Sequence, residues 1–353
     1  MRYRWLGRTG VKVSEFGFGA ATLGSRWGPR WTMSEEDADV VVGLALDAGI
    51  NHFDTANVYN GGESEVWLGR ALKAHSARDR VVLSTKFGYR TDPRNVNSGG
   101  SGRRAMTAAV DRSLRRLGTD WIDLYYLHLW DRETPVAETL AAAQTLVAQG
   151  KIRYLGVSNV PAWYVGVAEG LHPGAVSAVQ LNYNLLVRSV EHEFATLAEH
   201  TGVGLVGWGP LANGLLAGRY RVAEGERRLE GAGRLTETFG TGNVDPFAPG
   251  VGDVLEQLDK VAADTGHPRA VVALAWLLGR EPLASILLGV SGPEQLAQNL
   301  RAAEVDLPED ARTALDRVSE PVLAHPYNFL TPQLQKLVHG NDLPQRQKRA
   351  ADA

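Results

Sequence analysis

Residues 50–74 read INHFDTANVYNGGESEVWLGRALKA, a strand, a polar connection and a helix in succession. Residues 50–54, with Ile50 and Phe53 as their apolar members, predict a strand that ends at Asp54. Val66, Leu68 and Leu72 give residues 64–74 a helical pattern. This strand–helix unit is the one that the rest of the chain repeats.

Seven more strands are predicted on both sides of this unit, at 16–19, 81–86, 122–128, 152–157, 179–182, 204–208 and 285–289. A helix after the candidate N-cap Ser34 stops at Gly49, and later helices are predicted at 104–117, 136–148, 162–169, 193–200, 254–265, 269–278 and 293–302. Strand–helix alternation predicts a parallel sheet. Eight units favour an α/β fold closed into a (β/α)8 TIM barrel over an open sheet.

Three segments interrupt the alternation, at 91–102, at 219–252 and after Ser319. In a barrel such loops are either mobile surface or lids over a site. The runs 3–5 and 11–13 around a Gly-Arg-Thr-Gly turn predict an N-terminal hairpin that plugs the lower end of the barrel. We expect one barrel domain over 1–340 and a disordered tail at 341–353.

Composition excludes several classes of protein. The chain has 353 residues, 44% hydrophobic and 22% charged, with a net charge of −3, so nothing indicates nucleic acid or a membrane surface as a partner. No apolar run is long enough to span a bilayer. The absence of cysteine excludes disulfides, thiolate catalysis and cysteine-bound metal, and it fits a cytoplasmic protein.

Four titratable residues follow or end three neighbouring strands: Asp54 and Tyr59, then Lys86, then His128. Each alone is a weak indication, because a single Lys at a strand end is usually solvated. Together they suit carbonyl reduction, in which a proton must reach oxygen while a hydride reaches carbon. We expect Lys86 to lower the pKa of the Tyr59 phenol, Asp54 to hold Lys86, and His128 to bind the substrate oxygen. The alternative is an Asp–Lys pair that only closes the barrel.

With these motifs the chain resembles the aldo-keto reductase superfamily over residues 3–305. The resemblance lies in GINHFDTANVY (49–59), STKFG (84–88), LHLWD (127–131), GKIRYLGVSN (150–159), QLNYN (180–184), GWGPLANGLLAGRY (207–220) and LLGVSGPEQLAQN (287–299). It implies a metal-free enzyme that reduces aldehydes or ketones with NADPH, with Asp54, Tyr59, Lys86 and His128 as its catalytic tetrad.

The resemblance also implies the cofactor-binding residues. They are Ser158, Asn159, Gln180, Trp208, Pro210, Leu211, Gly214, Leu215, Arg219, Tyr220, Gly289, Ser291, Gln295 and Asn299. Two positions depart from the family pattern. Trp208 stands where a Tyr usually stacks on the nicotinamide, and no Lys or Arg occurs between Arg280 and Arg301 to bind the 2′-phosphate of NADPH.

Trp27, Trp31 and Trp130 are the predicted substrate-pocket residues, and if all three face the pocket they favour a flat aromatic carbonyl compound. The alternative is a general packing role for these side chains. Tyr327, Phe329 and Leu330 of the tail are expected to lie over the pocket. Two alternatives stay open: an NDP-sugar ketoreductase of secondary metabolism, and a cofactor-binding regulatory subunit on the same fold. The natural substrate, the direction of the reaction and the oligomeric state do not follow from the sequence.

Overall fold

The computed structural model describes residues 1–27, 32–223, 228–231, 233–237 and 244–340. By their contacts, the residues form two units, Met1–Ser319 and Glu320–Ala353. The first unit contains every element of the barrel, and the second contains a 3-10 turn and a short helix among its described residues.

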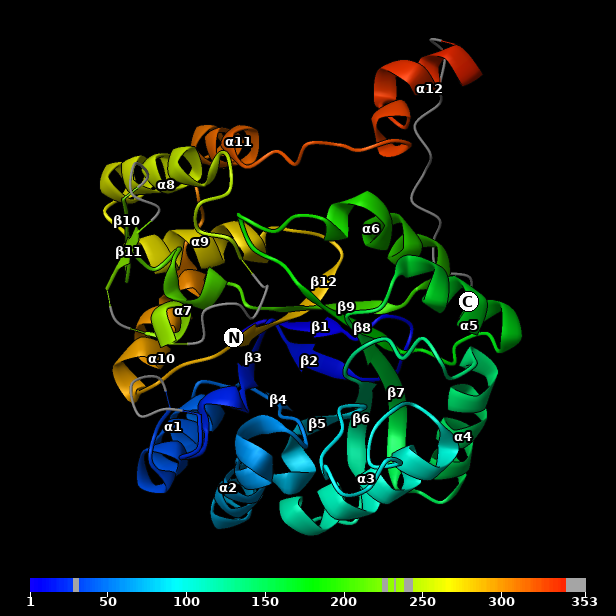
Figure 1. Ribbon diagram of the computed structural model, residues 1–353. Coiled ribbons are helices and arrows are strands. Elements are labelled where there is room, and N and C mark those ends of the chain that lie inside the picture. Colours follow the sequence, from blue (N-terminus) through cyan, green and yellow to red (C-terminus); the bar gives the residue numbers. More distant parts are fainter. Residues whose placement is uncertain (28–31, 224–227, 232, 238–243, 341–353) are drawn as a thin grey trace. The chain divides into compact units, whose positions relative to one another are not determined.

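Eight parallel strands close into a barrel in the order β12-β3-β4-β5-β6-β7-β8-β9 (Figure 1). Their bounds are β3 Phe16–Gly19, β4 His52–Asp54, β5 Val82–Phe87, β6 Ile122–Leu127, β7 Ile152–Ser158, β8 Ala178–Asn182, β9 Gly204–Trp208 and β12 Leu283–Leu288. The predicted (β/α)8 barrel is confirmed, and each predicted strand is present with ends that shift by at most two residues.

The strands are buried on both faces, as their sequences predicted. In β6, Leu124 and Tyr126 belong to the cluster inside the barrel, whereas Tyr125 and Leu127 belong to the larger cluster between strands and helices. Alternate side chains of a strand point to opposite faces, so a continuous apolar run fills both layers. This packing keeps the backbone rigid up to the strand ends.

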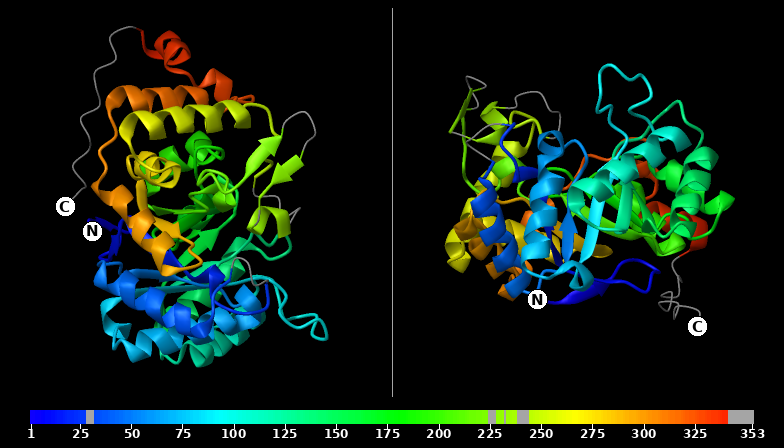
Figure 2. Two further views of the ribbon diagram at one scale, coloured as in Figure 1. Left: turned by 90° about the vertical axis from the view of Figure 1, so that its left-hand side faces the viewer. Right: turned by 90° about the horizontal axis from the view of Figure 1, so that it is seen from below.

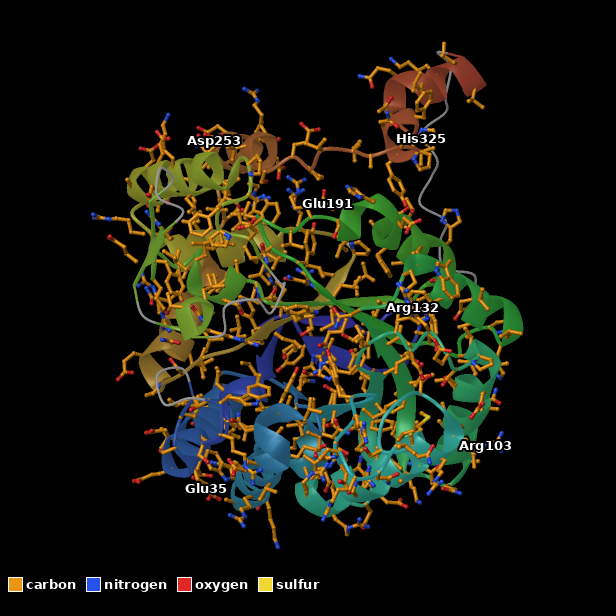
Figure 3. The ribbon with its side chains drawn as sticks, in the orientation of Figure 1. Glu35, Arg103, Arg132, Glu191, Asp253 and His325 are labelled. Atoms are coloured by element: carbon orange, nitrogen blue, oxygen red, sulfur yellow. The ribbon has the colours of Figure 1, made fainter. Side chains whose placement is uncertain are left out.

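Helices surround the barrel and connect the strands (Figure 1). They are α1 Glu35–Asp47, α2 Glu63–Ala74, α3 Arg103–Leu117, α4 Val136–Ala148, α5 Ala162–Leu171, α6 Val190–Thr201, α8 Val251–Thr265, α9 Arg269–Leu278, α10 Pro293–Leu300 and α11 Glu309–Val318. Short 3-10 turns are η1 Ala20–Thr22, η2 Tyr59–Gly62, η3 Arg78–Arg80, η4 Ala212–Gly214 and η6 Arg301–Glu304. Charged side chains such as Glu35, Arg103 and Asp253 are exposed on the outer helices (Figure 3).

Ser34 caps α1 as its sequence predicted. Its hydroxyl accepts a hydrogen bond from the Asp37 amide at 3.1 Å and donates one to the Asp37 carboxylate at 2.8 Å. Three acidic residues occupy the first turn of this helix, where the helix dipole favours negative charge.

An antiparallel hairpin, β1 Tyr3–Trp5 and β2 Lys12–Ser14, lies across one end of the barrel (Figure 2). Leu6 and Val13 are fully buried in the interior cluster. Arg4 donates hydrogen bonds to the carbonyls of Leu278 and Leu283, at the start of β12. The hairpin therefore closes the end at which the strands begin, and the opposite end is left for a site.

The long segment after β9 contains elements that the sequence did not predict. They are a second hairpin, β10 Arg221–Ala223 with β11 Arg228–Glu230, and a short helix, α7 Arg234–Glu237. The unpredicted helix α11 follows the last barrel unit. No helix in the described part of the chain is long and apolar enough to cross a membrane.

The second unit is described as far as residue 340. It contains a 3-10 turn, η7 Tyr327–Phe329, and helix α12 Pro332–His339, whose N-cap Thr331 accepts a hydrogen bond from the Leu334 amide at 3.4 Å. The predicted disorder at 341–353 concerns residues outside the described ranges. The single domain over 1–340 and the placement of the tail over the pocket stay predictions.

Candidate active site

The four predicted tetrad residues lie at the end of the barrel opposite the N-terminal hairpin. Asp54 is the last residue of β4, Lys86 lies near the end of β5, and His128 directly follows β6. Tyr59 begins the turn η2. Parallel strands end at the same edge of a barrel, so adjacent strands in hydrogen-bonded register bring these side chains together.

Lys86 connects Asp54 to Tyr59. Its buried ammonium donates hydrogen bonds to the Asp54 carboxylate, to the carbonyl of Thr55 at 3.0 Å and to the Tyr59 hydroxyl at 3.4 Å. Burial by itself lowers the pKa of the Lys86 ammonium. Asp54 and Tyr59 together raise that pKa by a larger amount, so it stands above the ordinary value. The side chain is therefore a fixed cation beside the phenol.

Both carboxylate oxygens of Asp54 accept hydrogen bonds from neighbouring side chains. Lys86 engages Oδ1, while Oδ2 accepts hydrogen bonds from the Ser84 hydroxyl at 2.7 Å and the Gln180 amide at 3.0 Å. The carboxylate is only 2% exposed, and a buried charge requires such partners. Three strands, β4, β5 and β8, therefore fix its orientation.

The pKa of Tyr59 differs from the sequence-based expectation. Burial raises the pKa of the hydroxyl above its usual value, and the Lys86 ammonium lowers it by a smaller amount. The expectation of a lowered pKa is thus corrected. The lowering interaction exists, but burial of the phenolate outweighs it. At neutral pH the phenol keeps its proton and is able to donate it.

His128 is held neutral. Burial, with a smaller contribution from Lys86, lowers the pKa of its imidazole well below the ordinary value. Its Nδ1 has no hydrogen-bond partner among the described residues. The Tyr59 and Tyr89 rings each pack in a T-shaped arrangement with the imidazole, at centroid distances of 5.6 and 4.9 Å. A neutral imidazole at this place is able to donate a hydrogen bond to an oxygen atom in the space beside it.

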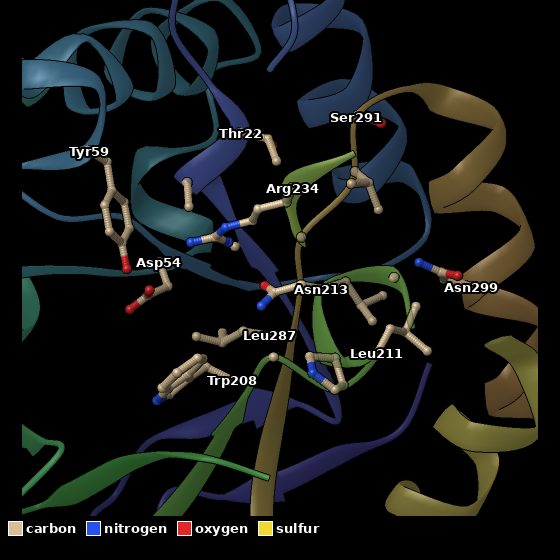
Figure 4. A pocket seen from close by; sticks show the side chains of 18 of the residues that line it. Thr22, Asp54, Tyr59, Trp208, Leu211, Asn213, Arg234, Leu287, Ser291 and Asn299 are labelled. Atoms are coloured by element: carbon tan, nitrogen blue, oxygen red, sulfur yellow. The ribbon is translucent and has the colours of Figure 1, made fainter. Parts of the chain in front are cut away.

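A cavity of about 1080 Å³ extends from this group along the ends of β9 and β12. Asp54, Tyr59 and His128 line it, whereas Lys86 lies behind them. Figure 4 shows Asp54, Tyr59 and Trp208 at one side of the cavity and Ser291 and Asn299 at the other. The space is long enough to contain reacting groups at one end and an extended ligand along the rest.

Asn159 organises the side of the cavity near the tetrad. Its amide nitrogen donates to the carbonyl of His128 at 3.0 Å and to the Ser158 hydroxyl at 2.9 Å, and its oxygen accepts from the Trp208 indole at 3.2 Å. Asn159 has a φ of 50°, a left-handed conformation that asparagine tolerates better than most residues. Ser158, Asn159, Gln180 and Trp208, all predicted, therefore lie together along this wall.

Most of the other predicted cofactor-binding residues also line the cavity: Pro210, Leu211, Gly214, Arg219, Gly289, Ser291, Gln295 and Asn299. The amide of Ser291 donates to the Gln295 side chain at 3.1 Å. Leu215 and Tyr220 are not among the lining residues. Leu215 is fully buried in the core, and the Tyr220 hydroxyl accepts a hydrogen bond from the Leu235 amide at 3.1 Å.

Of the three tryptophans predicted to line the substrate pocket, the structure describes Trp27 and Trp130. Trp27 lines the cavity, and its ring meets the edge of Tyr59 at a centroid distance of 5.5 Å. Trp130 does not line it, because its ring packs against Trp163 at 5.4 Å. Trp31 lies outside the described residues.

Sequence reasoning missed several lining residues, among them Thr22, Tyr89, Arg90, Asn213, Arg234 and Gln298. Figure 4 shows the Arg234 guanidinium directed toward Asp54 and Tyr59. Arg234 belongs to α7, in the segment that interrupts the strand–helix alternation, and no periodic pattern there indicates which side chains face inward. Tyr89 and Arg90 lie in the loop after β5, and their position shortly after a strand end was the available indication.

Over most of its length the chain is similar in sequence to known oxidoreductases. Residues 15–320 match the family model described as Aldo/keto reductase family. An aldo-keto reductase of Fusarium vanettenii is 34% identical, over 90% of this chain and 91% of its own. Norsolorinic acid reductase B of Aspergillus parasiticus is 34% identical, over 94% and 87%. An aryl-alcohol dehydrogenase of Pestalotiopsis microspora is 31% identical, over 91% and 82%.

Proposed function

The chain belongs to the aldo/keto reductase family, and from this membership we propose that it transfers a hydride from NADPH to an aldehyde or ketone, with Tyr59 as the general acid. Membership establishes the oxidoreductase class. The nucleotide, the carbonyl substrate and the role of Tyr59 are the parts that we propose.

The cavity suits a dinucleotide. Gly289, where β12 ends, lines it, and a Cβ at this position would meet no atom within 4 Å, so its backbone borders open space. Arg219 also lines the cavity and would suit a pyrophosphate. Ser158 and Asn159 would hold the nicotinamide amide, since Ser158 accepts its bond from Asn159 and keeps a hydroxyl proton to donate. When bound, NADPH would supply the hydride.

The chain's own residues would place the carbonyl and protonate its oxygen. His128 is neutral and binds the oxygen by a hydrogen bond, and Tyr59 is protonated and donates its proton. The Lys86 ammonium, 3.4 Å from the Tyr59 oxygen, stabilises the phenolate that this step leaves behind. Asp54 keeps Lys86 charged and in place.

One observation carries the proposal: Lys86 lies between a buried carboxylate and the hydroxyl of Tyr59, which faces a large cavity. An Asp–Lys pair that only closed the barrel would not need a tyrosine hydroxyl on its cavity side. This arrangement supports proton transfer to a bound oxygen.

The test follows absorbance at 340 nm with NADPH or NADH and a panel of aromatic and aliphatic aldehydes. The rings of Trp27 and Tyr89 beside Tyr59 and His128 lead us to expect faster turnover of aromatic aldehydes. Tyr59→Phe is expected to lower kcat by about a hundredfold or more, since general acid catalysis typically contributes that much.

Tyr125→Phe is the matched control. Its ring stacks on Phe87 in the core, and its hydroxyl has no hydrogen-bond partner among the described residues. This variant should keep the wild-type rate. Equal rates for wild type and Tyr59→Phe would remove Tyr59 as the acid, and tight NADPH binding without turnover would favour the regulatory-subunit alternative.

A further inference from the structure

The residue that directly follows Tyr59 connects two loops of the site. Asn60 lies in the turn η2 and is fully buried. All four of its side-chain hydrogen bonds go to backbone groups of the loop after β3. The amide nitrogen donates to the carbonyls of Ala21 at 3.2 Å and Leu23 at 3.0 Å, and the oxygen accepts from the amides of Arg26 at 3.1 Å and Trp27 at 2.9 Å.

These partners require an asparagine in one orientation. A primary amide has two protons to donate and two lone pairs to accept, and Asn60 uses all four. Two of its partners are carbonyls, which only accept, and two are backbone amides, which only donate. Exchanging the nitrogen and the oxygen of the side chain would therefore break every bond. An aspartate would have no proton for the carbonyls.

The backbone of both loops fits this contact. Asn60 has a φ of 49°, in the left-handed region that asparagine tolerates better than most residues. Gly24 has a φ of 133°, and a Cβ at this position would lie 2.3 Å from the Cβ of Asn60. The glycine therefore allows the loop after β3 to approach the asparagine closely.

The loop that Asn60 holds forms one wall of the cavity. Ala21, Thr22 and Trp27 of this loop all line it. The ring of Trp27 packs in a T-shaped arrangement with the ring of Tyr59, at a centroid distance of 5.5 Å. Because Asn60 bonds directly to the Trp27 backbone amide, the side chain next to the proposed acid also fixes the start of the aromatic wall beside it.

A second contact between the two loops lies nearer the surface. The Glu63 carboxylate accepts hydrogen bonds from the amide and the hydroxyl of Ser25, each at 2.9 Å, and from Arg26 at 3.0 Å. The Arg26 side chain is 64% exposed, and exposed ion pairs contribute little. Buried polar groups that lose their partners cost more. Asn60 is therefore the stronger of the two connections.

We propose that Asn60 is a positioning residue that holds Trp27 beside Tyr59 and thereby sets a preference for aromatic over aliphatic carbonyl compounds. The proposal rests on the proposed function, because the substrate would bind beside the Tyr59 hydroxyl. A flat ring between aromatic side chains gains contact area that an aliphatic chain does not fill in the same way.

Tyr59 has contacts of its own that do not use the Asn60 side chain. Its amide donates to the carbonyl of Ala56 at 3.1 Å, and its hydroxyl accepts from Lys86 at 3.4 Å. Loss of the Asn60 side chain should therefore displace Trp27 and leave the acid in place. The expected effect is on the KM for aromatic substrates more than on kcat.

Asn60→Gly tests this, because glycine adopts a positive φ and removes all four bonds. We expect kcat/KM for aromatic aldehydes to fall about fivefold, mainly through KM, and kcat/KM for aliphatic aldehydes to change less than about twofold. Part of the preference should remain, since Tyr89 still packs beside His128. In a Trp27→Leu background, Asn60→Gly should not change the aromatic-to-aliphatic ratio further.

Asn51→Ala is the matched control. Its side-chain oxygen accepts from the amide of Ser14 at 2.7 Å, and its nitrogen donates to the carbonyl of Lys12 at 2.9 Å. It thus connects backbone segments in the same way, but at the hairpin end of the barrel. This variant should keep the wild-type aromatic-to-aliphatic ratio. An equal fall of the ratio in Asn51→Ala, or a further fall caused by Asn60→Gly in the Trp27→Leu background, would overturn the proposal.

A second readout does not depend on turnover. In protein labelled with 5-fluorotryptophan, Trp27→Phe identifies the ¹⁹F resonance of Trp27. This resonance should move in Asn60→Gly, with a larger shift between H₂O and D₂O, and should stay in place in Asn51→Ala. An unchanged Trp27 resonance in Asn60→Gly would overturn the proposal.

The inference and the proposed function fail separately. Turnover that depends on Tyr59, with the same aromatic-to-aliphatic ratio in wild type and Asn60→Gly, retains the function and removes the inference. If the wild-type protein has no turnover with any aldehyde, the proposed function fails. The ¹⁹F resonances then still decide whether Asn60 holds Trp27 in place.

Discussion

At the scale of single residues, the site depends on one buried ion pair. Lys86 and Asp54 are both nearly inaccessible to solvent, with side-chain exposures of 1% and 3%. A buried pair adds little net stability relative to an apolar pair of similar volume, but removing one partner leaves an unpaired buried charge. The pair is therefore better explained by the cation that it places beside Tyr59 than by a contribution to folding.

Lys86→Met should therefore lower both activity and stability. Removal of the ammonium leaves the Asp54 carboxylate buried beside Ser84 and Gln180 alone, which should cost about 3–5 kcal/mol in the free energy of unfolding. Without the cation, the pKa of Tyr59 should rise further and kcat should fall by about a hundredfold or more. Denaturant titration and the 340 nm assay measure the two effects.

The double variant Lys86→Met with Asp54→Asn separates the two effects. It removes both charges, so most of the lost stability should return while activity stays low. If activity returned together with stability, the ammonium would have no role beyond pairing with Asp54.

At the scale of helices and strands, the sequence predicted the elements that carry the site. Asp54, Lys86, Ser158 and Trp208 all lie at strand ends, and a strand that is buried on both faces has a sequence pattern that marks where it ends. The alternation of strands and helices then placed these ends at one edge of a closed barrel. The fold, and the position of these side chains at one edge of the barrel, were predictable because both follow from local periodicity, whereas their catalytic role stays a proposal.

The loop residues were less predictable, for a physical reason. Trp130 and Trp27 both follow strand ends, yet one packs against Trp163 and the other lines the cavity. Their directions depend on loop conformations that no periodic pattern encodes. Helix α11 differs, since Pro308 and the two acidic residues in its first turn were start signals available in the sequence.

Helix α10 allows a prediction about the choice of nucleotide. Gln295 and Gln298 line the cavity with Asn299, and the sequence has no Lys or Arg from 281 to 300. Gln295→Arg should strengthen NADPH binding by about tenfold, or about 1.4 kcal/mol, and leave NADH binding nearly unchanged, since the added cation has a partner only in the 2′-phosphate. Fluorescence titration with both nucleotides measures the ratio.

Ala297→Arg is the matched control for this change. Residue 297 lies exposed on the same helix and does not line the cavity, so it adds the same charge without contact. An equal gain for NADH and NADPH in Gln295→Arg would show that residue 295 does not lie beside a bound 2′-phosphate.

At the scale of the whole molecule, the barrel contains two histidines that folding keeps neutral. Burial lowers the pKa of His52 to about 4 and the pKa of His128 well below its ordinary value. The unfolded chain binds protons on these side chains near pH 6.5, and the folded barrel does not. The burial of these two histidines thus makes the fold sensitive to acid.

The free energy of unfolding should therefore fall as the pH is lowered from about 6.5 to 4. Because the folded-state pKa lies below the unfolded value, the unfolded state takes up more protons in this window, and stability is greatest above it. For His52 alone the difference approaches about 3 kcal/mol at 1.36 kcal/mol per pKa unit.

Urea titrations at pH 7, 5 and 4 should show a smaller loss of stability in His52→Gln than in the wild-type protein, whatever the absolute stability of the variant. His172→Gln, at an exposed position after α5, should keep the wild-type pH dependence. If wild type and His52→Gln lost stability in parallel over this range, His52 would not be the buried group whose protonation destabilises the folded barrel.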